Sequence, residues 1–285
     1  MEYKKNNLLL NRVFSKSTLI SLLNSKHGSN AFYAVIQRYV DNTEDKTNRQ
    51  LISEIYQKLK TNYRNEYYYK NTLLNKLLFK KHSPYKTTAL TEIPVSKSKA
   101  DFILINGKAV VYEIKTELDN FDRLDSQLEN YYKAFDHVCI VTSEINLESL
   151  IKRIDNNNIG IYKITKRGAL SVVREPIQDR SHLEHETIFK ILRKYEYENI
   201  LLEYYKQLPN VSQFQYYKEC KRLFANIEIN TAYEKFRLEL KKRCKINIDY
   251  VSSIPDEIKS VVYFSSLKDG EFENLNIFLD KKYGG

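Results

Sequence analysis

The stretch from Ser98 to Tyr132 constrains the fold of this 285-residue chain more than any other part of the sequence. Apolar and β-branched residues fill 102–105 and 109–114, and the dipeptide Asn106-Gly107 separates the two runs. Two such runs joined by a short polar link predict adjacent antiparallel strands. Both runs are apolar on both faces, which is typical of strands in a sheet that helices cover. The sequence therefore predicts a β-hairpin inside an α/β fold.

Three charged residues interrupt this apolar hairpin: Asp101 in the first strand, and Glu113 and Lys115 at the end of the second. Side chains alternate between faces along a strand, so the two acids share a face only if the connection has odd parity, with Gly107 in the left-handed region. Lys115 then shares that face. Two carboxylates and an ammonium group at a strand end suit Mg²⁺, which prefers oxygen ligands. A solvated, salt-bridged hairpin end is the alternative interpretation.

An apolar stripe predicts a helix over residues 117–134. Gln127 and Tyr131 lie four positions apart and therefore on one helix face, where both could hydrogen-bond phosphate oxygens or water. The acids of this segment favour a helix start and a solvated face over metal ligation; they are Asp119, Asp122 and Asp125.

With these residues the chain resembles the PD-(D/E)XK nuclease superfamily, and within it the bacterial and phage group named after sce7726. The resemblance covers about Glu66 to Ser143. The position before Asp101 holds Ala100, where the superfamily motif has a loosely kept proline. The resemblance implies an α/β fold of the restriction-endonuclease-like kind, in which helices flank a mixed β-sheet, here with helical N- and C-terminal extensions.

The resemblance implies a Mg²⁺-dependent nuclease that hydrolyses phosphodiester bonds of DNA, with Mn²⁺ as a substitute ion. Asp101, Glu113 and the carbonyl of Ile114 would bind the ion. Lys115 would position the attacking water, and the ion would neutralise charge that develops on the phosphate.

The remaining site residues come from the family's Q-x-x-x-Y motif and from an acid on the preceding helix. Gln127 and Tyr131 match the former and would steady the phosphate or the helix. Glu66 is the first candidate for the acid, and Glu92 on the preceding strand is the second. Glu66 either reaches the metal face or begins its helix, where the dipole favours a carboxylate.

The charge balance favours a polyanionic partner. Lys plus Arg exceed Asp plus Glu by 46 − 36 = 10, and the pI is about 9.2. Such an excess favours nucleic acid, DNA first and RNA second, through neutralisation of phosphates. A Lys-rich composition without any partner is the alternative. The oligomeric state stays open, with a homodimer among the alternatives.

The cysteines and the hydropathy of the sequence indicate in which cellular compartment the protein is expected. The three cysteines form no C-x-x-C pair, which favours a reducing cytoplasm. The N-terminal apolar run is too short for a signal peptide, and no segment approaches the roughly 18 apolar residues that span a bilayer. We therefore expect a cytoplasmic protein without a membrane partner.

Changes in pattern along the chain predict three consecutive parts: a helical extension over 1–46, the nuclease-like α/β core over 47–177 and a helical region over 178–285. The core begins with two helices over 47–80 that break near Asn62, and it includes an edge strand over 159–165. The last helices carry a set of cations that either contact DNA or solvate the bundle: Lys218, Lys221, Arg222, Lys235, Arg237, Lys241, Lys242 and Arg243.

Two other functions remain open. The chain could be a nucleic-acid-binding module or accessory subunit that keeps the nuclease fold without cleaving. It could also be a helical interaction protein in which the α/β core merely carries the C-terminal helices. A role in phage defence or mobile-element biology is what the family resemblance suggests.

Overall fold

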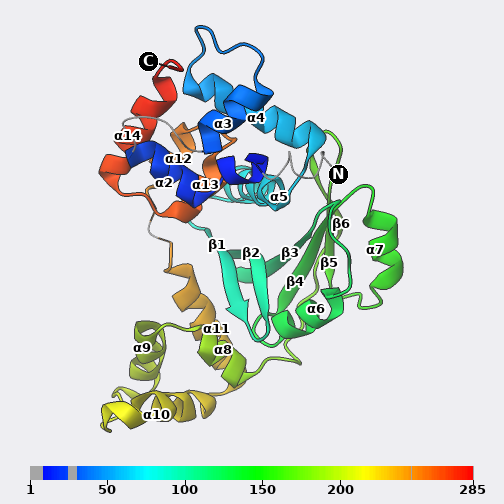
Figure 1. Cartoon of the computed structure of the whole chain (residues 1–285). Coiled ribbons are helices and arrows are strands. Elements are labelled where there is room, and N and C mark those ends of the chain that lie inside the picture. The colour runs from blue at the N-terminus through cyan, green and yellow to red at the C-terminus, as the bar shows by residue number, and fades with distance from the viewer. Residues whose placement is uncertain (1–8, 25–30, 245, 285) are drawn as a thin grey trace. The chain divides into compact units, whose positions relative to one another are not determined.

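The computed structural model describes residues 9–24, 31–244 and 246–284, which form two compact units (Figure 1). Met1–Pro84, Thr116–Leu118 and Lys245–Gly285 form one, here called the terminal unit. Tyr85–Lys115 and Asp119–Cys244 form the other, here called the sheet unit. This division differs from the three consecutive parts expected from the sequence, because the terminal unit combines segments from the two ends of the chain.

The sheet unit contains a mixed six-stranded sheet in which the strands follow one another in sequence order. Its strands are β1 (Thr88–Val95), β2 (Ser98–Asn106), β3 (Lys108–Lys115), β4 (His137–Ser143), β5 (Gly160–Ile164) and β6 (Leu170–Arg174). The first three are antiparallel, β3 to β5 are parallel, and β6 is antiparallel to β5. The expected α/β class with a mixed sheet flanked by helices is confirmed.

The two parallel connections run through α6 (Leu124–Tyr132) and α7 (Leu147–Arg153). The predicted helix over 117–134 was therefore too long at its start. Leu118 N–H donates to Thr116 Oγ1 at 3.1 Å, and Asp122 N–H donates to Asn120 Oδ1 at 3.4 Å. Such local side-chain acceptors compete with helical hydrogen bonds, so the segment turns instead.

The edge of the sheet was also predicted wrongly. The strand β5 pairs on both sides, and the strand β6, which the sequence patterns did not predict, forms this edge of the sheet. A turn returns the chain at Thr165, whose backbone N–H donates to the carbonyl of Ala169 at 2.9 Å. Val172 and Val173 are exposed on this edge strand.

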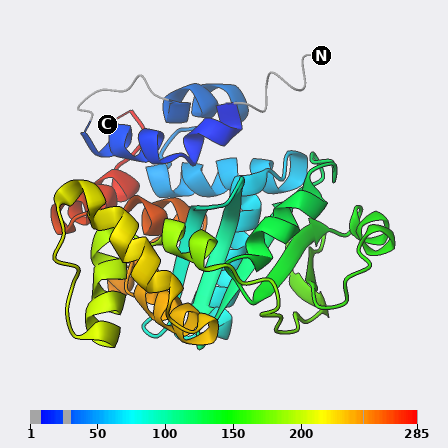
Figure 2. The same cartoon turned by 90° about the horizontal axis from the view of Figure 1, so that it is seen from below.

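The C-terminal helices of the sheet unit are α8 (His185–Ile191), α9 (Lys194–Tyr205), α10 (Gln213–Ala225) and α11 (Ile229–Lys241). α8 packs against β1 and α11 against β2 (Figure 2). The helical segment between Ile188 and Tyr205 is interrupted at Leu192, which adopts an extended conformation, and Glu196 Oε2 accepts the backbone N–H of Arg193 at 2.7 Å. This cap starts α9 as a separate helix.

The terminal unit is helical. It comprises α2 (Lys16–Asn24), α3 (Ala31–Tyr39), α4 (Asn48–Asn62), α5 (Glu66–Leu73), the π-helix η1 (Leu74–Lys81), α12 (Ile248–Ser253), α13 (Lys259–Ser265) and α14 (Asp269–Asp280). The predicted break near Asn62 is confirmed, since α4 ends there and Asn65 caps α5. No helix within the described ranges is both long and apolar enough to cross a membrane.

Candidate functional site

The turn between β2 and β3 sets which residues share a face. The register pairs Asn106 with Lys108, so Gly107 alone lies between the paired positions. Its φ of 73° is in the left-handed region, which glycine adopts without steric cost. The predicted odd parity is confirmed, and this register, continued one step beyond the last paired residues, brings Asp101 and Glu113 to facing positions.

The two hairpin strands separate at this pair of acids. Pairing between β2 and β3 ends at Phe102 and Tyr112, whereas β3 stays paired with β4 as far as Lys115. Asp101 Oδ2 accepts the backbone N–H of Ile114 at 2.8 Å. A side-chain carboxylate thus takes the place of a backbone acceptor at the point where the ladder opens.

Four predicted site residues meet in one buried set of hydrogen bonds, here called the Glu113 cluster: Glu113, Lys115, Gln127 and Tyr131. Glu113 Oε1 lies 3.0 Å from Lys115 Nζ, and Nζ donates to Gln127 Oε1 at 2.8 Å. The Tyr131 hydroxyl donates to Glu113 Oε2 at 2.5 Å. Glu113 is 1% exposed and Lys115 7% exposed, so this is not a solvated surface pair.

The protonation of Tyr131 follows from its surroundings. Burial raises the pKa of its hydroxyl well above the ordinary value, and the negative charges of Glu113 and Asp101 raise this pKa further. The hydroxyl therefore stays protonated and acts as a donor. It also lies 3.0 Å from the carbonyl oxygen of Lys99.

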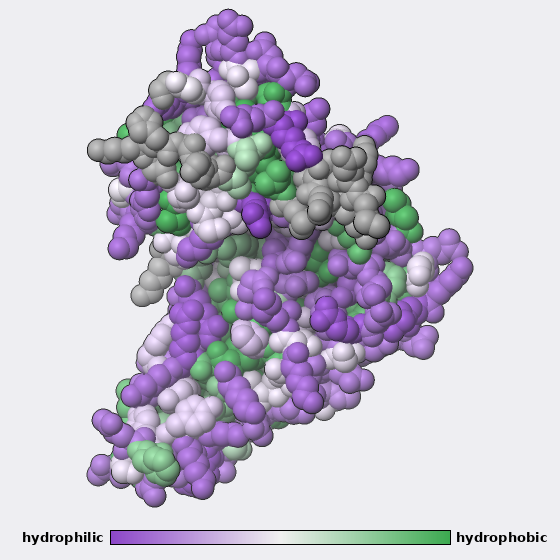
Figure 3. Space-filling view, in the orientation of Figure 1, coloured by the Kyte–Doolittle hydropathy of each residue, from purple (hydrophilic) through white to green (hydrophobic). Residues whose placement is uncertain are grey.

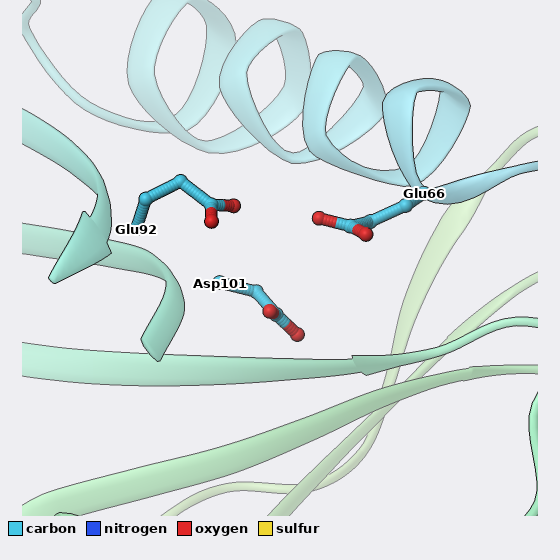
Figure 4. A group of neighbouring side chains, drawn as sticks. All are labelled: Glu66, Glu92 and Asp101. Atoms are coloured by element: carbon cyan, nitrogen blue, oxygen red, sulfur yellow. The ribbon is translucent and has the colours of Figure 1, made fainter. Parts of the chain in front are cut away.

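Glu92 lies beside Asp101 across the β1–β2 ladder, because Thr91 pairs with Phe102 and Ile93 with Ala100. Carboxylate oxygens of Glu92 and Asp101 lie within 4.8 Å of each other (Figure 4). Glu92 also forms an ion pair with Lys99. Its φ of 58° is uncommon for a residue other than glycine and interrupts the alternation of side chains along β1.

Glu66, also labelled in Figure 4, is the first residue of α5 in the terminal unit. It is exposed and forms an ion pair with Lys70 at 2.5 Å. Its position in the first helical turn agrees with the interpretation that the helix dipole favours a carboxylate there.

The structure also bears on the cations of the C-terminal helices. Six of the eight form ion pairs with carboxylates: Lys221 with Glu186, Arg222 with Glu219, Lys235 with Glu203, Arg237 with Glu234, Lys242 with Glu239 and Arg243 with Glu196. These pairs neutralise most of the positive charge that a polyanion would contact. A solvated helical bundle therefore accounts for this set of cations better than a DNA-binding surface does.

Two features of the site have no signal in the sequence. The left-handed backbone of Glu92 is not marked by a glycine, and the contact of Tyr131 with the Lys99 carbonyl involves a backbone atom that any residue supplies. Both features depend on how β1, β2 and α6 are aligned in the folded chain.

A sequence profile of the family described as Bacteriophage P4 protein cII matches residues 59–259. The chain belongs to this family. Protein cII of Enterobacteria phage P4 is 25% identical over 173 residues, which cover 58% of this chain and 63% of that protein. The chain thus spans less than two thirds of the length of this cII relative. Every residue of the candidate site lies within the stretch that the cII profile matches.

One solved structure is similar over part of the chain. It is the SPO1766 protein of unknown function from Silicibacter pomeroyi, with 13% sequence identity and a TM-score of 0.29. The similarity covers 45% of this chain and 88% of that one.

Proposed function

We propose that this member of the P4 cII family is a metal-dependent nuclease with a restriction-endonuclease-like core, which hydrolyses phosphodiester bonds of DNA. One observation carries the proposal: the buried ammonium group of Lys115 lies between Glu113 and Gln127, next to the point where β2 and β3 separate. Burying charges costs free energy that a surface pair would not incur. Such a cost is common at catalytic sites, where charges must be held in place.

Every candidate ligand is an oxygen, which is the ligand type that a hard divalent cation prefers. Asp101, Glu113 and the carbonyl of Ile114 would hold Mg²⁺ or Mn²⁺, and Glu92 is a further candidate through its proximity to Asp101. When bound, the ion would supply positive charge that stabilises the phosphate as negative charge builds on its oxygens.

The other residues would act as follows. The Lys115 ammonium would orient a water molecule for in-line attack on phosphorus and offset its developing charge. Gln127 and Tyr131 would be positioning residues, since Gln127 accepts from Lys115 and Tyr131 donates to Glu113. For Glu66 the role of an additional acid rests on the family resemblance alone.

Incubation of the purified chain with supercoiled plasmid DNA and Mg²⁺ or Mn²⁺ tests the proposal. We expect nicked or linear products, none in EDTA, and a loss of rate of about 100-fold or more in Asp101→Asn and Lys115→Met, since the first would remove a ligand of the ion and the second a positive charge that stabilises the transition state. Lys108→Met, at the exposed opposite end of β3, is the matched control and should cleave normally. If plasmid DNA, single-stranded DNA and RNA all remain uncleaved with either ion, the proposal is contradicted.

A second candidate function is a nucleic-acid-binding module that does not cleave. It is favoured by the hydrogen bonding of Glu113, whose two oxygens already accept from Lys115 and Tyr131. Binding that survives EDTA and weakens steeply with salt, without products, would identify this function. The relative's name as a phage protein supports a setting in phage defence or mobile-element biology for either function.

The cysteines support the proposed cytoplasmic location. Cys139, Cys220 and Cys244 are all free thiols, and the first two are buried. Free thiols persist in a reducing compartment.

A further inference from the structure

A pocket of about 850 Å³ lies in the sheet unit, away from the Glu113 cluster. Residues of α6, the C-terminal end of α7 and the segment before α8 line it. None of Glu113, Lys115, Gln127 and Tyr131 is among the lining residues. The pocket is therefore separate from the proposed nuclease site, and the inference below does not rest on that function.

The floor of this pocket is apolar. Leu128, Tyr132, Ile154 and Ile159 contribute to it, and each is buried. Tyr132 is 4% exposed, and its hydroxyl has no hydrogen-bond partner among the described residues. This hydroxyl oxygen is itself buried, so Tyr132 lines the pocket through its carbon atoms.

The rim of the pocket is charged, with an excess of acids. Arg153 pairs with Asp125 at 2.6 Å, and Lys133 pairs with Glu184 at 3.3 Å. Two further acids of the rim, Glu129 and Asp155, have no cationic partner within the part of the chain that the structure describes. After these pairs cancel, two negative charges remain above the apolar floor.

We infer that this pocket binds a small organic cation with an apolar body, of the amidinium, guanidinium or primary-ammonium class. The apolar body would lie on Leu128, Ile154 and Ile159 and leave water, as apolar surface does in ligand sites. The N–H groups of the cation would donate to the carboxylates of Glu129 and Asp155. An anion such as a nucleotide would meet repulsion at the same rim.

Such a cation could be a free metabolite or the side chain of an arginine or lysine in a partner protein. The chemistry of recognition is the same for both, because the pocket would contact the same guanidinium or ammonium group and the same methylene stem. The probes below distinguish the two sources.

The test is a ligand-observed NMR titration of the full chain with benzamidine and with its neutral counterpart benzamide. We expect saturable binding of benzamidine at least tenfold tighter than that of benzamide, and weaker binding at high salt, since screening acts on an exposed charge pair. Binding to the double variant Glu129→Gln, Asp155→Asn should be about three- to tenfold weaker, as expected for two exposed charge contacts.

Glu148→Gln is the matched control, because Glu148 is an exposed acid on α7 that does not line the pocket. Equal affinity for benzamide, or undiminished binding of benzamidine to the double variant, would overturn the inference. Titration with a capped pentapeptide that has a central arginine distinguishes a free small molecule from a protein side chain as the source of the cation. The same peptide with citrulline in place of arginine is its neutral control. Tighter binding of the arginine peptide than of benzamidine indicates a protein side chain, and the reverse order indicates a free small molecule.

Discussion

The carboxylate of Glu113 has a partner on each oxygen, Lys115 on Oε1 and the Tyr131 hydroxyl on Oε2. All three side chains are buried, so the loss of one partner leaves a buried charge or polar group that is costly to leave unpaired. The residues proposed to act in catalysis therefore also contribute to folding. A loss of activity in any variant must be compared with its loss of stability.

Lys115→Met should lower the free energy of unfolding by about 3–5 kcal/mol, because it leaves the buried Glu113 carboxylate without its cation. Adding Glu113→Gln should recover part of this loss, since the neutral amide still accepts from Tyr131. Urea unfolding of both single variants, the double variant and Lys108→Met measures the coupling. Additive losses in the double variant would mean that the pair does not interact.

At the scale of elements, a single buried carboxylate connects three segments of the sheet unit. Asp136, just before β4, lies 2.7 Å from His137 Nδ1 and accepts from the Tyr233 hydroxyl of α11 at 2.5 Å. Its other oxygen accepts from Gln178 at 2.8 Å and from Arg180 at 2.9 Å. Burial alone would raise the pKa of Asp136, but these hydrogen bonds outweigh burial and lower it far below the ordinary value.

This lowered pKa predicts acid sensitivity. The stabilisation by Asp136 is fully present above its unfolded pKa of about 3.9 and is lost as the pH falls from there towards the lower folded pKa. Asp136→Asn should cost about 1.5–3 kcal/mol at pH 7, as expected for hydrogen bonds to a charged group, and should flatten the loss of stability below pH 4. Urea unfolding at pH 7, 5 and 3 measures both effects.

Asp122→Asn is the control for this prediction, because Asp122 is an exposed acid. It should leave the stability at pH 7 and its dependence on pH unchanged. If Asp136→Asn and the natural chain lose stability in parallel between pH 5 and pH 3, the carboxylate does not have the assigned role.

At the scale of the whole molecule, the terminal unit is closed by contacts between distant parts of the chain. The backbone N–H of Asn48 donates to the carbonyl of Lys281 and its side chain donates to that of Phe278, both at 2.9 Å. Asn71 donates to the carbonyl of Asp256 at 2.8 Å and accepts the backbone N–H of Ser260 at 3.0 Å. The helices after residue 245 thus complete the core around α4 and α5.

A chain that ends at Cys244 should keep a folded sheet unit and lose the terminal unit. The deletion removes buried apolar side chains, among them Phe272, Leu275 and Leu279, which the remaining helices need to cover their faces. Limited proteolysis with mass spectrometry should show rapid cleavage before residue 85 and a protected fragment from about 85 to 244. The full chain is the reference. Equal protection of both regions would contradict the division.

The α/β class and most of the Glu113 cluster followed from patterns that are close in the sequence. A glycine in the turn decides the parity of the hairpin, and a spacing of four places Gln127 and Tyr131 on one helix face. Both rules concern residues that are close in the sequence, so they can be applied to a single sequence without knowledge of the fold. The metal assignment and the nuclease activity stay predictions.

Only the tertiary structure decided the features that depend on a distant partner. The separation of β2 from β3, the left-handed Glu92 and the edge strand β6 each depend on how strands align in the folded sheet. Three of the cation pairs, Lys221 with Glu186, Lys235 with Glu203 and Arg243 with Glu196, join segments far apart in the chain. The assembly of the terminal unit from both ends of the sequence belongs with them. Local propensity sets the conformation of a segment, whereas its partners are selected by packing and hydrogen bonding across the folded molecule.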